Sequence, residues 1–279
     1  MSALERWRRE LAAWAIPDEI LANAPESPWG FAPELFRHRA ERTRETPTAT
    51  TRLVLDALGT GGEVLDVGVG GGATSLPLAT RATLITGVDA SGDMLEGFLR
   101  SARDAGVEAA VVGGPWPEVS SEVGQADVVV CGHVLYNVGD LEPFVRALDD
   151  HARRRVVIEI TAVHPLAWMA DLWSRFHGLA RPSGPTSGLA AAAIAELGVP
   201  VRRTDESRSP RPGGFERRDD AVALVRRRLC LNADRDPELA DALGDRLRER
   251  DGLWAAGPSE HAVTTLWWDR AVGGAGPTA

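Results

Sequence analysis

The sequence predicts an α/β fold, a doubly wound and mostly parallel sheet of seven strands with helices packed against it. Three observations lead to this prediction. Short β-branched runs recur along the chain, amphipathic helical patterns separate them, and one run leads directly into a glycine-rich loop. The 279 residues, 44% of them apolar, suffice for one large domain or for two small ones. The spacing of the motifs favours a single large domain.

Seven segments have the composition and the Gly, Asp or Pro boundaries that are typical of strands. They are residues 63–68, 83–89, 109–113, 127–131, 155–161, 199–204 and 262–269. The clearest helix between them places Leu141, Phe144, Val145 and Leu148 on one face, behind Asp140 as the expected capping residue. Regular alternation of strand and helix is what makes the sheet mostly parallel.

Residues 1–270 are expected to form a single domain, followed by a flexible tail at 271–279. We expect a helical N-terminal cap at 1–60, a cofactor-binding half at 61–161 and a substrate-side half at 162–270.

Residues 219–250 depart from the alternation, and their apolar spacing predicts a helical hairpin inserted before the last strand. A lid over the ligand and extra cover for the core are both compatible with such an insertion.

Composition excludes several classes of protein. All 31 basic residues are arginines, scattered among 40 acidic residues with a net charge of −9, so nucleic acid is not the expected partner. The two cysteines, Cys131 and Cys230, belong to no CxxC motif or Cys/His cluster, which argues against a disulfide scaffold and a zinc site. No run is long enough for a signal segment or a membrane span. A cytoplasmic protein is therefore expected, of undetermined oligomeric state.

The most informative segment is a buried-type strand that ends in a glycine loop with Gly68, Gly70 and Gly72. Glycines permit positive φ and a close approach of the backbone to a ligand, and we expect a helix at 73–78 to follow. Asp89 ends the next strand, 21 residues after Gly68, where a carboxylate can accept hydrogen bonds from both hydroxyls of a ribose. Tight turns and helix capping are the structural alternatives for these residues.

Two kinds of cofactor are compatible with the loop. One is a dinucleotide, because the glycines also satisfy the looser pattern of dinucleotide binders, and the other is a cofactor with a cationic amino-acid portion. Asp66 favours the second kind. A carboxylate two residues before the first glycine suits a cofactor with a cationic amino-acid portion, whereas it would repel a pyrophosphate.

With Asp66, Gly68, Gly70 and Gly72 in an acidic-x-G-x-G-x-G motif, the sequence resembles the class I, Rossmann-like S-adenosylmethionine-dependent methyltransferases. The resemblance implies that Asp89 holds the ribose, and that Ala90 and Met94 flank the adenine. It extends closely over residues 63–161, and the last two predicted strands are consistent with the closing antiparallel hairpin of the family.

The resemblance places further cofactor contacts after the third and fourth strands. Where family members often carry an acidic residue that reads the adenine amino group, this chain has Gly114 and Trp116. A main-chain group of Gly114 could replace the acid, and the Trp116 ring could lie on the adenine face or simply pack in the core. Gly132 follows the fourth strand, where the family lines the transferable methyl group.

His133 and Tyr136 are the candidate catalytic residues, because they follow directly at the same sheet edge. Histidine is the side chain best suited to remove a proton near neutral pH. Tyr136 could orient substrate or cofactor through its hydroxyl, and His164 is the second candidate base. A structural role is the alternative for each.

Aromatic side chains after the fifth strand could cover a flat or apolar acceptor, although ordinary helix packing explains their spacing equally well. They are Trp168, Trp173, Phe176 and the neighbouring His177. No paired Asp/Asn arrangement indicates a metal site, so metal-independent chemistry is expected.

The predicted function is methyl transfer from S-adenosylmethionine to an oxygen, nitrogen or carbon atom of a small molecule, with S-adenosylhomocysteine as product. The segment after the fourth strand lacks the Asn/Asp-Pro-Pro-Tyr/Phe signature of methyltransferases that act on the amino nitrogen of adenine or glutamine. Two alternatives remain open, an NAD(P)-dependent oxidoreductase and a non-catalytic protein that binds the adenosyl ligand.

Overall fold

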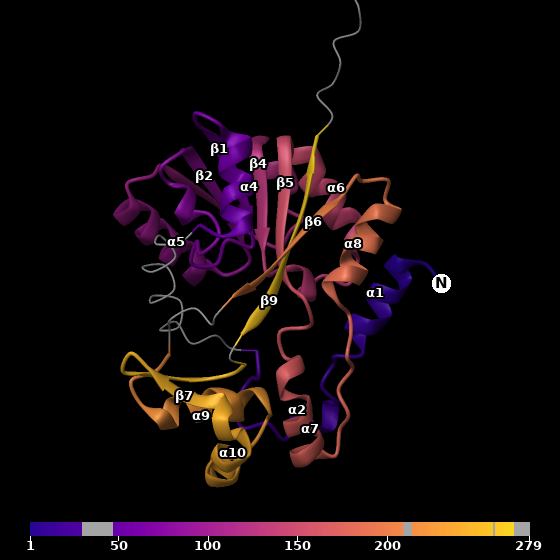
Figure 1. The fold of residues 1–279 in the computed structure, drawn as a ribbon, viewed down its shortest axis with the longest axis vertical. Coiled ribbons are helices and arrows are strands. Elements are labelled where there is room, and N and C mark those ends of the chain that lie inside the picture. Colours follow the sequence, from indigo (N-terminus) through magenta and orange to yellow (C-terminus); the bar gives the residue numbers. More distant parts are fainter. Residues whose placement is uncertain (30–46, 209–213, 259, 271–279) are drawn as a thin grey trace, which may run out of the picture.

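The computed structural model describes residues 1–29, 47–208, 214–258 and 260–270, and the predicted tail at 271–279 lies outside them (Figure 1). A seven-stranded sheet with the order β3-β2-β1-β4-β5-β9-β6 forms its centre. Strands β1 to β5 pair in parallel, and β9 pairs antiparallel with both β5 and β6. The predicted doubly wound, mostly parallel sheet is confirmed.

Buried β-branched runs determine most of the strands. Their bounds are β1 Gly62–Val67, β2 Ala82–Asp89, β3 Ala109–Gly113, β4 Ala126–Gly132, β5 Ala152–Thr161, β6 Arg202–Arg208 and β9 His261–Asp269. The strand predicted at 199–204 lies instead at Arg202–Arg208. This strand, β6, is a polar edge strand, so its pairing with β9 identifies it and an apolar run does not.

Helices cover both faces of the sheet, and side chains that alternate along each strand supply two apolar clusters. On one face Leu65 and Val129 pack with α1 (Ala3–Ala12), α6 (Leu141–His151) and α8 (Ser187–Glu196). On the other face Val64 and Val128 pack with α4 (Ala49–Leu58) and α5 (Gly92–Ala105). The strand period of two thus places successive residues in different clusters.

Local signals explain where these helices begin. The hydroxyl of Ser91 accepts the main-chain N–H of Met94 at the start of α5, and Thr48 caps α4 in the same way. Asp140 stands at the N-cap of α6 as predicted, but its side chain makes no capping hydrogen bond. It pairs instead with Arg8 of α1, at 3.1 Å.

A helical lobe lies beyond the carboxyl ends of the parallel strands (Figure 1). It comprises α2 (Asp18–Ala22), α7 (Ala170–His177), α9 (Arg218–Arg228), α10 (Asp236–Leu243) and the hairpin of β7 (Leu247–Arg250) and β8 (Leu253–Ala256). A third apolar cluster holds it together, with Met169, Trp173 and Leu239 among its most buried side chains. The lobe therefore has a core of its own at the edge where ligands bind in such sheets.

Two expectations for local structure were wrong. The helix predicted at 73–78 is a turn followed by a single 3-10 turn, Leu76–Leu78, because β2 begins only four residues later. The helical hairpin at 219–250 contains both of its helices, but Leu247 starts β7 instead of ending α10. Within the described residues no helix is long and apolar enough to cross a membrane.

Candidate active site

The loops after β1 and β4 pack directly against each other at the carboxyl edge of the sheet. A Cβ atom on Gly68, where φ is +75°, would lie 2.2 Å from Cγ2 of Val134. A Cβ atom on Gly132 would lie 2.2 Å from the hydroxyl of Thr74. Only glycine permits this approach. Gly132 and Val134, the neighbours of His133 in the chain, are therefore in close contact with the glycine loop.

Four N–H groups of the glycine loop donate within the protein. Those of Gly68 and Val69 donate to the carbonyl of Val88 at 2.8 and 3.0 Å, and that of Gly70 donates to Oδ2 of Asp89 at 2.9 Å. The N–H of Gly72 donates to a carbonyl within the loop at 2.7 Å. No α-helix follows the loop before β2, so the loop lacks the helix N-terminus that binds a pyrophosphate in dinucleotide-binding folds.

Asp66 is buried in β1, at 1% exposure, and neither carboxylate oxygen has a hydrogen-bond partner among the described residues. Burial raises the pKa of this carboxyl to about 7, the nearby Ser75 hydroxyl opposes the rise, and the charge of Asp89 adds to it. Buried polar atoms without partners are costly. Asp66 is therefore suited to receive a cationic group or a bridging water of a ligand.

Asp89 connects the glycine loop to α5. Its Oδ2 accepts from Gly70 and its Oδ1 accepts from the N–H of Ser91, at 2.9 Å each. Ser91, rather than Asp89, supplies the N-cap of α5. Each carboxylate oxygen can accept a second hydrogen bond, so the carboxylate retains the capacity to hold a ribose.

The residues predicted to flank the adenine lie beside Asp89. Ala90 is exposed and Met94 is half-buried at the start of α5. The N–H of Gly114 donates to the carbonyl of Asp89 at 3.0 Å, so this N–H is not available to read an adenine. The cofactor contacts expected of Ala90, Met94 and a main-chain group of Gly114 stay predictions.

The structure places Trp116 against α6. Its indole N–H donates to the carbonyl of Phe144 at 3.4 Å, and its ring meets the edge of His151 at 5.0 Å between centroids. These contacts agree with the packing alternative, and contact of the ring with the adenine face stays a prediction.

His133 extends from the end of β4 toward β5. Its Nε2 lies 3.0 Å from Oε1 of Glu159, and its main-chain N–H donates to the carbonyl of the same residue at 2.7 Å. The backbone at His133 has φ +62°, a left-handed conformation that is uncommon for residues other than glycine. Such geometry persists where neighbours fix it, and it is concentrated at functional sites.

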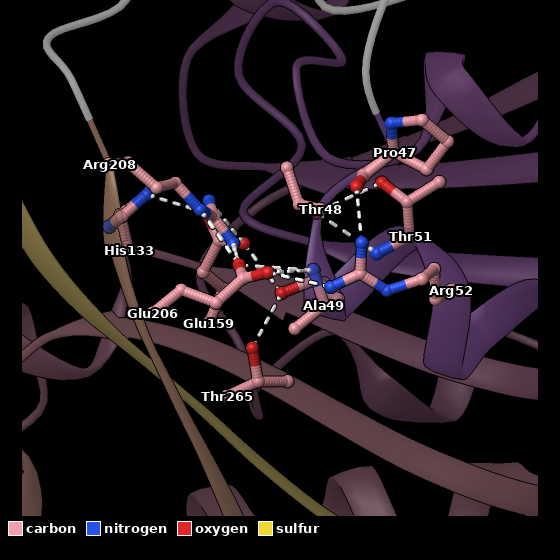
Figure 2. A network of polar contacts seen from close by, with 11 residues as sticks. Pro47, Thr48, Ala49, Thr51, Arg52, His133, Glu159, Glu206, Arg208 and Thr265 are labelled. Carbon is pink, nitrogen blue, oxygen red and sulfur yellow. Dashed lines mark hydrogen bonds and ion pairs between the residues drawn. The ribbon is translucent and has the colours of Figure 1, made fainter.

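A polar network surrounds this pair (Figure 2). Oε2 of Glu159 accepts from the hydroxyl of Thr50 at 2.5 Å and pairs with Arg208 at 3.0 Å. Arg208 pairs in turn with Glu206, which accepts the first N–H of α4. Sequence reasoning missed Glu159, Thr50 and Arg208. The available signal was a single carboxylate inside the apolar run of β5.

Tyr136 and His164 are parts of a packed aromatic group. The Tyr136 ring stacks on Trp7 at 5.7 Å, and its hydroxyl donates to the carbonyl of Thr161 at 2.8 Å. His164 stacks on Trp14 at 3.8 Å, and burial together with the charge of Arg181 lowers the pKa of its imidazole to about 4. These contacts favour structural roles for both residues over the predicted catalytic ones.

The aromatic segment predicted to cover the pocket belongs to the lobe. Trp173 is buried in the core of the lobe and packs on His177, whose Nε2 lies 2.6 Å from the carbonyl of Leu229. Among the described residues, no three His, Cys, Asp or Glu side chains gather in a metal-binding group.

Comparison with known proteins identifies the central part of the chain. Residues 64–155 match the family model described as a methyltransferase domain. Over 102 residues the chain is 29% identical to the ubiquinone biosynthesis O-methyltransferases of Rickettsia akari (strain Hartford) and Rickettsia canadensis (strain McKiel). These matches cover 37% of this chain and 40% and 43% of the two relatives, so the chain spans well under half of their length.

Among solved structures, the fold is similar to that of magnesium protoporphyrin IX methyltransferase from Synechocystis PCC 6803 with bound S-adenosylhomocysteine. The TM-score is 0.47 at 19% identity, over 66% of this chain and 85% of that one.

Residues 64–155 match a methyltransferase domain, and the glycine loop between Asp66 and Asp89 lies within this match. The sheet order is the one that the resemblance to class I S-adenosylmethionine-dependent methyltransferases implied. S-adenosylmethionine is the cofactor of this class. The residues fit it, because Asp66 offers an unpartnered carboxylate where a cationic amino-acid portion is expected and Gly70 leaves open space above the loop.

Proposed function

We propose that the protein transfers a methyl group from S-adenosylmethionine to a small-molecule acceptor and releases S-adenosylhomocysteine. The observation that carries this proposal is the buried carboxylate of Asp66 beside a glycine loop that leads into no α-helix. A cationic ligand satisfies that carboxylate, whereas a dinucleotide pyrophosphate would meet its negative charge and find no helix N-terminus. The geometry therefore favours the adenosyl cofactor over NAD(P).

The cofactor supplies a methyl group on a positively charged sulfur, ready for in-line displacement. The protein has to hold the acceptor and the methyl carbon about 3–3.5 Å apart and exclude water. The remaining acceptor capacity of Asp89 supports a role in holding the ribose, and the close contact of the loop after β4 with the glycine loop supports a place for it beside the reaction centre. An oxygen acceptor is consistent with the Rickettsia relatives, which are named as O-methyltransferases.

Calorimetric titration with S-adenosylmethionine, S-adenosylhomocysteine, NAD and NADP tests the proposal. We expect binding of the two adenosyl ligands only, weakened at least about tenfold in Asp89→Ala, since a lost charge-assisted hydrogen bond is worth roughly 1.5–3 kcal/mol. Asp104→Ala removes the same charge at the far end of α5 and should bind like the wild type.

Binding of a dinucleotide alone would refute the methyltransferase proposal in favour of an oxidoreductase. Tight binding of S-adenosylhomocysteine without methylation across a broad panel of acceptors would instead favour a non-catalytic binding protein.

A further inference from the structure

Glu159 is a buried carboxylate in a strand whose neighbouring residues are apolar. Its exposure is 2%, and it lies next to the carboxyl edge of β5. Burial alone would raise the pKa of Glu159, but the hydrogen bond and charge of His133, the charge of Arg208 and the hydroxyl of Thr50 together hold it well below its usual value. Glu159 is therefore ionised and can only accept hydrogen bonds.

An acceptor on one side of an imidazole determines where its proton lies. Because Oε1 of Glu159 faces Nε2 of His133 at 3.0 Å, the neutral imidazole carries its proton on Nε2. The other ring nitrogen, Nδ1, is then the basic one. The His133 side chain is 44% exposed, whereas that of Glu159 is 3% exposed.

The second oxygen of Glu159 keeps the carboxylate from turning. Oε2 accepts from Thr50 of α4 and pairs with Arg208 of β6, so two elements fix this oxygen. Figure 2 shows Arg208 beside Glu159. The main chain of His133 also bonds to Glu159, which maintains its left-handed backbone. Both the tautomer and the direction of the imidazole therefore depend on Glu159.

We propose that Glu159 is a positioning residue, which fixes His133 as the Nε2–H tautomer so that Nδ1 accepts the proton of an acceptor hydroxyl. This inference rests on the proposed function and names its acceptor class. The hydroxyl proton passes to Nδ1, the oxygen electron pair forms the bond to the methyl carbon, and the methyl–sulfur bond breaks with its electron pair going to sulfur. The positive charge of the sulfonium thus ends on the imidazolium.

The variant Glu159→Gln gives a specific expectation. In the wild type, Oε2 accepts from two donors, Thr50 and Arg208. In the variant the amide oxygen should occupy the position of Oε2, where it can accept from both, and the NH₂ group should then face Nε2 of His133. Nε2 must then accept, and the proton moves to Nδ1. A base with the wrong tautomer can lose several orders of magnitude in rate while its geometry is unchanged.

The tautomer is measured by long-range ¹H–¹⁵N correlation on the ¹⁵N-labelled protein, without any acceptor. His133→Asn identifies the His133 signals by their loss, and asparagine tolerates the left-handed backbone. We expect the Nε2–H form in the wild type and the Nδ1–H form in Glu159→Gln. The matched control is Glu206→Gln, a carboxylate of the same network that pairs with Arg208 rather than with His133, and it should keep the wild-type tautomer. An Nδ1–H wild type overturns the proposal.

Rates with two probe acceptors, catechol and the more acidic 4-nitrophenol, provide the second measurement. His133→Asn and Glu159→Gln should each lower kcat for catechol by about 10²-fold or more, with a smaller loss for 4-nitrophenol, because an acidic hydroxyl needs less help from a base. Wild-type kcat in Glu159→Gln overturns the proposal, and so does methylation of neither phenol by a wild-type protein that binds S-adenosylhomocysteine. Failure to bind S-adenosylhomocysteine would instead remove the proposed function.

Discussion

Replacing Asp66 by Asn should stabilise the protein at neutral and alkaline pH. Burial raises the pKa of Asp66 from its ordinary 3.8 to about 7 in the folded chain. Each pKa unit corresponds to about 1.4 kcal/mol, so the ionised carboxylate is about 4 kcal/mol less stable in the folded chain than in the unfolded one. A raised carboxyl pKa means that the wild type loses this stability as the pH rises from about 4 to 7. The asparagine variant does not lose it.

Urea unfolding of both proteins at pH 4 and pH 8 measures this effect. The free energy of unfolding of Asp66→Asn, minus that of the wild type, should increase by about 4 kcal/mol between the two pH values. Other groups titrate equally in both proteins, and their contributions cancel in the difference. If the difference in unfolding free energy is the same at pH 4 and pH 8, the reasoning is refuted, because ionising Asp66 would then not destabilise the folded protein.

The same substitution should weaken cofactor binding. The ionised carboxylate is the form that attracts a cationic ligand, so the affinity of the wild type for S-adenosylhomocysteine should rise as the pH increases from 6 to 8. Calorimetry on Asp66→Asn should show weaker binding without this increase. Equal affinity in the two proteins at pH 8 would place the cationic group of the cofactor elsewhere.

Three further predictions concern glycine, histidine and tyrosine residues. Gly68→Ala should cost about 2–4 kcal/mol of unfolding free energy, because its Cβ would meet Val134, whereas Gly70→Ala, with nothing within 4 Å, should cost about 1 kcal/mol in urea titrations. His164→Phe should remove the loss of stability, about 3 kcal/mol, that a folded-state pKa of about 4 produces as the pH falls from 6.5 to 4. Tyr136→Phe should lower stability by about 1 kcal/mol and leave kcat within about twofold, and a large fall in kcat would restore its catalytic role.

The sequence predicted the parallel part of the sheet to within a few residues, because buried strands read as continuous β-branched runs. It did not predict the β7–β8 hairpin. Leu239, Leu243 and Leu247 share a helical spacing, and this pattern obscured the Asp251-Gly252 turn, whose two positive φ values are typical of a two-residue hairpin.

The cofactor side of the site was predictable because its residues lie close together in the sequence. Asp66, the glycines and Asp89 occupy one strand–loop–strand unit, and a local motif can represent them. The network around His133 was not predictable in the same way. Thr50 and Glu159 are 109 residues apart, and the packing of α4 on β5 brings them together.

The composition of the helical lobe has a consequence for the order of folding. Its core combines Ile16, Trp173 and Leu239, which come from three distant parts of the chain. The parallel strands β1 to β5, in contrast, are joined by short crossovers along one continuous stretch. Contacts between distant residues carry a loop-closure entropy that has to be overcome before they stabilise anything. We therefore expect the lobe to assemble after the parallel part of the sheet that carries the glycine loop.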